Sequence, residues 1–140
     1  MVKKPLGKEF YTYGIDFSSL AASTDSSGII NIEADSWFIA QKLTYTADIA
    51  AATQTANSRV IPLCTILITD TGSGRQLSNI AMPIPSIMGN GELPFILPTP
   101  KIFKPRSAIS VKVANYSAAT TYNLHIAIHG SKAWYDTDPV

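Results

Sequence analysis

Histidines are the side chains most often used for metal binding and proton transfer near neutral pH, and this chain has two, His125 and His129. They lie four residues apart in an alternating run that predicts a strand, where four residues span about 13 Å. Two ligands of one zinc ion must lie much closer together, because each Zn–N bond measures about 2 Å. We therefore interpret both histidines as ordinary residues of a polar face or an interface.

Carboxylate pairs are the next candidates for chemistry. Glu33 and Asp35 share a face at a spacing of two residues, and Asp136 and Asp138 lie in the C-terminal tail. Paired carboxylates perform acid and base catalysis only inside a cleft that shifts their pKa values. The sequence indicates no such cleft around either pair, so we expect structural roles for all four.

Two further segments contain potentially reactive groups. The segment DTGSGR, Asp70 to Arg75, lacks the spacing of a phosphate-binding loop, and we interpret Gly72 and Gly74 as positive-φ positions of a hairpin turn. Cys64 lies in the apolar run VIPLCTILI, which predicts a buried and unreactive thiol. No serine lies in a GxSxG motif. The sequence thus predicts no catalytic residue, no metal ligand and no cofactor site, and we expect a protein that is not an enzyme.

The composition restricts the class of protein that must carry these residues. The chain has 140 residues, of which 46% are hydrophobic and 15% charged, and its net charge is +1. Soluble domains have about 25% charged residues. Disordered tails need low hydrophobicity and high charge, and nucleic-acid binders need a basic excess, so both classes are excluded. We also expect neither a membrane-spanning helix nor a secretory signal, because every apolar stretch is too short.

Alternation of apolar and polar residues dominates the C-terminal third. Apolar residues recur at every second position in the runs from Ser107 to Ser117 and from Thr121 to Gly130. The apolar side chains of each run therefore lie on one face, as in a half-buried strand. The inward residues are Ile109, Val111, Val113, Tyr122, Leu124, Ile126 and Ile128. The short link NYSAAT between the two runs predicts an antiparallel hairpin with one buried face.

Further strands are predicted upstream, over residues 10–17, 29–34, 37–46 and 59–69, the last buried on both faces. The proline-rich stretch from Met82 to Pro105 excludes a helix and predicts short edge strands and corners where the chain crosses between sheets. The alanine-rich residues 47–57 predict an exposed loop with at most one helical turn. Together these segments predict an all-β, antiparallel β-sandwich of jelly-roll type with about eight strands.

The predicted domain organisation is simple. Residues 1–9 form a flexible N-terminal arm, residues 10–135 form the single jelly-roll domain, and residues 136–140 form a C-terminal tail. Between Glu92 and Asp136 there is no acidic residue. The basic residues of that span are Lys101, Lys104, Arg106, Lys112 and Lys132. They form either a solvated rim that is balanced by acids elsewhere, or a basic contact face for an acidic protein surface.

Several segments resemble small jelly-roll virion proteins of tailed bacteriophages, the capsid cement or decoration proteins. They are TDTGSGRQLSN (Thr69 to Asn79), MPIPSIMGNGELPFILPTPKIFKPRS (Met82 to Ser107), and the closing segments SVKVANYS and YNLHIAIHGSKAW. This resemblance implies a structural protein on the capsid exterior, made in the host cytoplasm, with no cofactor. The implied partner is the phage major capsid protein, with no direct contact to nucleic acid or membrane. We also expect further copies of this chain as partners, in a homodimer or homotrimer, because an exposed and weakly charged sheet needs covering.

The expected capsid contacts follow from the basic span and its aromatic residues. They are Lys101, Phe103, Lys104, Arg106 and Trp134. Two alternatives remain open at this point. One is a neck or tail component of the same particles, and the other is a carbohydrate-binding jelly roll. The rings expected to face solvent in a sugar site are Tyr11, Tyr13, Trp37 and Tyr116.

Overall fold

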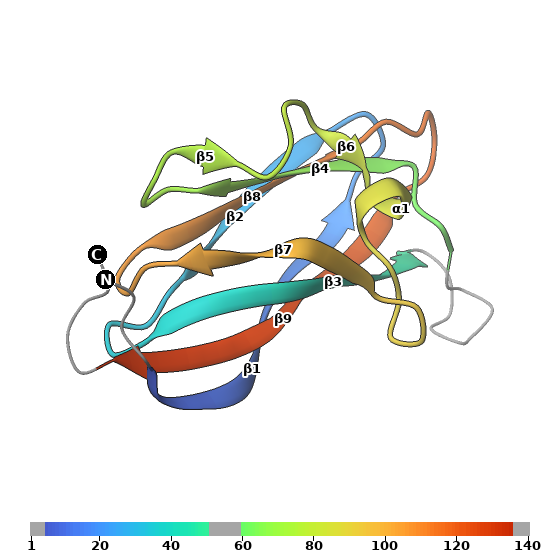
Figure 1. The fold of residues 1–140 in the computed structure, drawn as a ribbon. Coiled ribbons are helices and arrows are strands. Elements are labelled where there is room, and N and C mark those ends of the chain that lie inside the picture. Colours follow the sequence, from blue (N-terminus) through green and yellow to red (C-terminus); the bar gives the residue numbers. More distant parts are fainter. Residues whose placement is uncertain (1–4, 51–59, 136–140) are drawn as a thin grey trace.

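A computed structural model describes residues 5–50 and 60–135, which are almost entirely β-structure (Figure 1). The strands are β1 (Pro5–Leu20), β2 (Asp25–Asn31), β3 (Trp37–Ile49), β4 (Cys64–Asp70), β5 (Arg75–Gln76), β6 (Met82–Pro83), β7 (Phe95–Phe103), β8 (Ala108–Asn115) and β9 (Tyr122–Tyr135). A single helical turn, α1 (Ile84–Ile87), follows β6. No helix in this part of the chain is long and apolar enough to cross a membrane.

The strands form two antiparallel sheets that face each other (Figure 1). Sheet A has the order β1-β9-β3-β7, and sheet B has the order β2-β8-β4-β5, with β6 also on β4. The first strand pairs with the last, β2 with β8, β3 with β7, and β4 with the short strands that follow it. A long hairpin that is rolled across two sheets gives this order, which confirms the predicted antiparallel β-sandwich of jelly-roll type.

Alternating side chains build the core between the sheets. In β8, Ile109, Val111 and Val113 are fully buried, and β9 buries its four predicted inward residues in the same core. The predicted hairpin between these two strands is nevertheless wrong, because β8 belongs to sheet B and β9 to sheet A. Their apolar faces meet across the sandwich, and the link between them crosses from one sheet to the other.

Asn115 explains why the chain changes sheets at this point. Its side-chain amide donates to the carbonyl oxygens of Leu20 and Thr120, at 3.0 and 2.8 Å, and its Oδ1 accepts from the Ser117 amide at 2.9 Å. These bonds tie the end of β8 to the end of β1, which lies in the opposite sheet. A six-residue link is therefore held open as a crossover and does not close as a tight turn.

The proline-rich stretch follows the prediction in outline. It supplies the two-residue strand β6 of sheet B and then the edge strand β7 of sheet A. The exclusion of helix was wrong for one turn, since α1 includes Pro85. Proline is tolerated there because the amides of the first helical turn have no acceptor within the helix.

The N-terminal strands are longer than the prediction. β1 begins at Pro5, so residues 5–9 pair with β9, with Lys8 opposite Ala133. β3 runs to Ile49 and includes the first residues of the predicted loop 47–57. β4 buries only one face completely, because Thr65, Leu67 and Thr69 are half-buried. Residues 1–4, 51–59 and 136–140, with the predicted C-terminal tail, lie outside the described residues.

Candidate functional site

Phe103 was expected to contact a capsid, but it belongs to the core. Its side chain is fully buried, and its ring stacks on that of Phe38 with centroids 6.3 Å apart. Successive side chains of β7 point to opposite faces of sheet A, so Phe103 points into the core while its neighbour Ile102 is 50% exposed. The prediction was therefore displaced by one residue, and Ile102 is the apolar side chain that this strand offers to solvent.

Lys101 joins the two sheets, from the edge strand β7 of sheet A to the end of β4 in sheet B. Its Nζ lies 3.3 Å from Oδ2 of Asp70, whose side chain is almost completely buried, and 5.8 Å from the centre of the Phe103 ring. Asp70 also accepts hydrogen bonds from the amide of Gly72 and the hydroxyl of Ser73. Lys101 thus neutralises a buried carboxylate and is not free to bind a partner.

Lys104 and Arg106 form the exposed part of the predicted contact set, in the turn between β7 and β8. The hydroxyl and amide of Ser107 both donate to the Lys104 carbonyl oxygen, at 2.6 and 3.2 Å. Arg106 adopts a left-handed conformation, with φ of 64°. No carboxylate among the described residues lies within 4.0 Å of either cation, so both charges face solvent in this part of the structure.

The remaining basic residues do not extend this turn into a single basic face. Lys112 pairs with Asp25 on the exposed side of sheet B, at 3.8 Å. Lys132 is buried and pairs with Glu33, and Trp134 is half-buried in β9, opposite Gly7. Of the two interpretations of the basic span, the structure supports a set of separate ion pairs around one exposed basic turn.

Lys132 is the centre of a small structural cluster. Its Nζ lies 2.8 Å from Oε2 of Glu33 and 3.8 Å from the centre of the Tyr11 ring. Desolvation lowers the pKa of Lys132, but the hydrogen bond to Glu33 and the charges of the neighbouring tyrosines raise it further, so that the pKa lies above its ordinary value. The cluster stabilises the junction of β1, β9 and the β2–β3 connection, which agrees with a structural role for Glu33.

The histidines have separate partners on the outer face of sheet A, away from sheet B. Nδ1 of His125 lies 2.8 Å from Oδ1 of Asp16. Nδ1 and Nε2 of His129 lie 2.9 and 2.8 Å from the hydroxyl oxygens of Thr12 and Thr44. A hydroxyl can donate or accept, so both bonds of His129 can form with a neutral ring. The two residues are parts of the polar face, as predicted from their spacing.

The DTGSGR segment is a tight turn that packs on β8. Only Gly74 has a positive φ, 71°, which corrects the prediction for Gly72. Gly72 is required for space, because a Cβ there would lie 2.9 Å from the Cβ of Ser107. The segment connects β4 to β5, and Asp70 accepts hydrogen bonds from the backbone amides of Gly72, Ser73 and Gly74. It has the geometry of a turn and offers no cradle for a phosphate.

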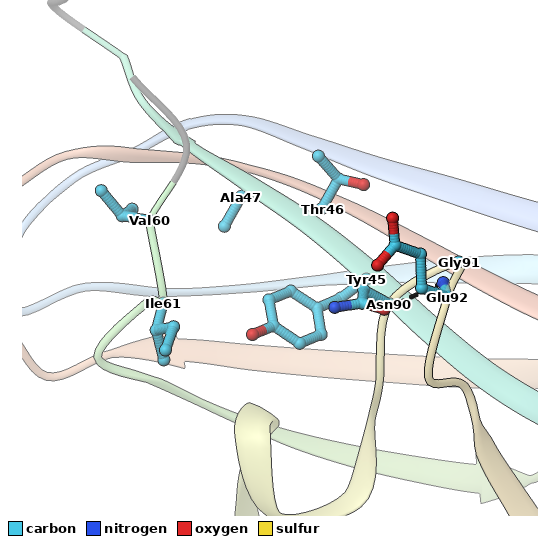
Figure 2. Close-up of a pocket in the computed structure, with 8 residues that line it drawn as sticks. All are labelled: Tyr45, Thr46, Ala47, Val60, Ile61, Asn90, Gly91 and Glu92. Atoms are coloured by element: carbon cyan, nitrogen blue, oxygen red, sulfur yellow. Dashed lines mark hydrogen bonds between the residues drawn. The ribbon is translucent and has the colours of Figure 1, made fainter. Parts of the chain in front are cut away.

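A cleft of about 520 Å³ lies beside the end of β3 (Figure 2). Its lining residues are Tyr45, Thr46, Ala47, Val60, Ile61, Asn90, Gly91 and Glu92. Oδ1 of Asn90 already accepts from the amides of Glu92 and Leu93, so this side chain shapes the loop. Glu92 is the single acidic side chain of this lining, and Tyr45 is its single tyrosine. The lining therefore does not contain a general base in hydrogen-bonding contact with a nucleophile.

Reactive groups elsewhere are similarly isolated. Cys64 is fully buried, and burial raises the pKa of its thiol to about 11, which confirms the predicted buried cysteine. Within residues 5–50 and 60–135, no three His, Cys, Asp or Glu side chains lie close enough to hold a metal ion.

The outer face of sheet A carries an apolar row that sequence analysis missed. Register places Phe10 beside Ser131, Ser131 beside Ile39, and Ile39 beside Ile102. Ile96 occupies the same face, one row along β7. The exposed fractions are 75% for Phe10, 63% for Ile96 and 50% for Ile102. We call the four apolar residues of this row, Phe10, Ile39, Ile96 and Ile102, the apolar face.

A sequence signal for the apolar face existed. Two predicted strands contain adjacent apolar residues, Phe38–Ile39 and Ile102–Phe103, where a half-buried strand has one apolar and one polar residue. Such a pair places an apolar side chain on each face of its sheet. The outer face of sheet B lacks this feature over β8, where Ser110 and Lys112 alternate with buried residues.

The rings that would form a carbohydrate site do not share one surface. Tyr13 is 7% exposed, and its ring packs edge-on against Phe38 in the core. Tyr11 is half-buried beneath Lys132, whereas Tyr116 is exposed after β8, beside Leu63. Trp37 is half-buried at the start of β3. Sugar-binding platforms present coplanar rings to solvent, and this arrangement does not provide one.

Comparisons with known proteins add little to this description. No protein-family model and no curated protein matches the sequence. A solved structure with some similarity is the VP2 subviral particle of infectious bursal disease virus, with 12% sequence identity and a TM-score of 0.33. The match covers 96% of this chain, which spans 39% of the length of that one. The jelly-roll assignment rests on the strand order described above, and no relationship is inferred from this overlap.

Proposed function

We propose that the protein is a structural virion protein, a capsid cement or decoration protein that binds the outer surface of a phage capsid. The observation that carries this proposal is the apolar face, where three large side chains are at least half exposed on one sheet of a jelly roll. Exposed apolar patches of this kind mark interaction surfaces. The resemblance of the segments between Thr69 and Trp134 to phage decoration proteins supplies the identity of the partner.

The basic turn between β7 and β8 places positive charge beside the apolar face. Lys104 follows Ile102 by two residues, so its solvated charge lies next to the apolar face. Charges at the rim of an interface steer association and fix its register more than they add affinity. The proposed partner is therefore a major capsid protein whose outer surface combines an apolar patch with acidic residues.

Stabilisation of the shell would follow from mass action. A protein that binds only the assembled shell stabilises that state in proportion to the logarithm of its free concentration over the dissociation constant. Contacts that span two capsid subunits add buried area at their boundary. Neither step needs a catalytic group, which agrees with the isolated reactive residues of the described chain.

The proposal is tested with purified shells that lack this protein. Ile96→Asp places a charge in the apolar face, and Ile29→Asp is the matched control, because Ile29 is also 63% exposed but lies on β2 of sheet B. We expect the affinity for shells to fall at least about tenfold with Ile96→Asp and to stay unchanged with Ile29→Asp. Equal binding of both variants would refute the assignment of the surface.

Mass spectrometry of purified particles tests the role itself. A copy number comparable to that of the major capsid protein is expected for a decoration protein. A copy number far below that of the major capsid protein would instead indicate a neck or tail component, and absence from particles would refute a virion role.

A further inference from the structure

β1 is the least protected edge of the sandwich. An exposed edge presents free amides and carbonyls, and proteins protect such edges with prolines, bulges or short strands. β7 has Pro98 and Pro100, and its residues 97–100 leave the ladder with β3. β5 and β6 have two residues each, and β2 has seven. β1 has sixteen residues, and its only proline is Pro5 at the first position.

Two outer-face residues of β1 are not fully explained by contacts within the chain. Gly14 has an ordinary φ, and a Cβ there would meet nothing closer than the Ile126 carbonyl oxygen at 3.7 Å, so no contact requires glycine. Glycine inside a strand weakens it and often marks a close approach of another chain or side chain. Phe10, four residues earlier on the same face, stacks on the His129 ring with centroids 6.4 Å apart, and this contact still leaves its side chain 75% exposed.

We propose that β1 pairs antiparallel with β1 of a second copy of this chain, around a two-fold axis beside Thr12. Lys8 then lies opposite the partner's Asp16, Phe10 opposite the partner's Gly14, and Thr12 opposite the partner's Thr12. Each pair occurs twice, as a two-fold interface requires. Sheet A becomes a continuous sheet of eight strands that crosses both subunits.

Each of these cross-strand pairs is a favourable one. Opposite charges and paired threonines stabilise neighbouring antiparallel strands, and an aromatic ring laid over an edge glycine covers its bare backbone. The carboxylate of Asp16 remains accessible to Lys8 of a second copy, because the side chain is 67% exposed although its Oδ1 contacts His125. Lys8 is exposed and has no carboxylate within 4.0 Å among the described residues.

The neighbouring registers lose these pairs. An axis between two residues would set outer side chains opposite inner ones, which the pleat forbids in a continuous sheet. An axis beside Tyr11 would place Lys8 opposite the partner's Gly14. An axis beside Tyr13 would place Phe10 opposite the partner's Asp16 and Lys8 opposite the partner's Ser18. Only the axis at Thr12 satisfies the charges and the glycine together.

Charge exchange tests the dimer with the isolated protein and is independent of any capsid. In the Lys8→Asp variant both pairs become acid against acid, and in the Asp16→Lys variant both become base against base. By sedimentation velocity we expect a wild-type dimer, and a dissociation constant raised about tenfold or more in each variant. An equimolar mixture of the two variants restores both attractive pairs, so we expect a heterodimer of wild-type affinity.

The controls exclude effects of net charge and of misfolding. Lys104→Asp makes the same charge change away from β1 and should leave the dimer intact. Thr12→Cys should form a disulfide-linked dimer under mild oxidation, since opposed residues on paired strands lie within disulfide distance, whereas Ser18→Cys should not. A wild-type monomer at millimolar concentration, a dimer that Lys8→Asp leaves intact, or variants that fail to recover on mixing would overturn the proposal.

Discussion

Gly130 is a position where the structure predicts a large effect of one added methyl group. It lies in β9 between Tyr11 of β1 and Ala40 of β3, next to the bulge where β3 inserts Gln41 into the ladder. A Cβ at Gly130 would overlap the carbonyl oxygen of Ile39 and would lie 2.8 Å from its carbonyl carbon. Both atoms are backbone, so no side chain can rotate away to make room.

The size of the effect follows from the required movement. Ordinary contact begins at about 3.4 Å, so β3 must withdraw from β9 by more than half an ångström at the centre of sheet A. Overpacking costs about 1 to 3 kcal/mol, and straining one or two ladder hydrogen bonds adds about 1 kcal/mol each. We therefore expect Gly130→Ala to lower the free energy of unfolding by about 2 to 5 kcal/mol, out of a typical total of about 5 to 15.

Urea unfolding at one fixed protein concentration measures this change, with the slope of the transition unchanged. Gly91→Ala is the control, because a Cβ at Gly91 would meet nothing within 4 Å, and its effect should stay within about 0.5 kcal/mol. If Gly130→Ala were as stable as Gly91→Ala, the close approach of β3 and β9 would be wrong.

Four further variants have expected outcomes in urea unfolding. The raised pKa of Cys64, from 9.0 to about 11, means stability that is complete below pH 9 and is lost as the pH rises through 11, on the order of 3 kcal/mol in total. Cys64→Ala should remove this part of the alkaline decline. Glu33→Gln should cost about 1 kcal/mol, since it leaves the buried Lys132 ammonium without its anion, whereas Lys132→Met should stay within about 1 kcal/mol of wild type. Ser36→Ala should stabilise by about 1 kcal/mol, because the buried Oγ of Ser36 has no hydrogen-bond partner among the described residues.

Each of these expectations has a result that contradicts it. An unchanged alkaline slope in Cys64→Ala would assign the decline to other groups, such as Tyr13, whose pKa burial also raises. A larger loss in Lys132→Met than in Glu33→Gln would mean that the packing of the lysine stem exceeds its ion pair. A destabilised Ser36→Ala would show that the hydroxyl has a partner.

Local pattern predicted the faces of the strands but not their neighbours. Residues 109, 111 and 113 of β8 and the inward residues of β9 are buried as the alternation predicts. The same alternation is compatible with a hairpin and with two sheets that face each other. The decision depends on Asn115, whose amide contacts Leu20, 95 residues away in the sequence. Such a contact leaves no local signal.

The candidate contact surface was likewise predicted only where local sequence determines it. The exposed turn at Lys104 and Arg106 was predicted from composition, whereas Phe103 was displaced by one residue because the phase of β7 was ambiguous between its prolines. The apolar face was missed because its members come from β1, β3 and β7, and only the sheet order brings these strands together. Lys101 was predicted as free because Asp70 is 31 residues away in the sequence and in the other sheet.

The pairing of the first strand with the last also determines how the domain responds to mechanical load. Pro5 lies opposite Tyr135, so the ends of the described chain leave the sandwich side by side, from neighbouring antiparallel strands. A pull on these two ends separates β1 from β9 one hydrogen bond at a time, like a zipper, and never loads the whole ladder in shear. A force that enters through the broad surface of sheet A is instead shared by all four of its strands. The domain is therefore built to resist load across its sheets and to yield to load along its chain.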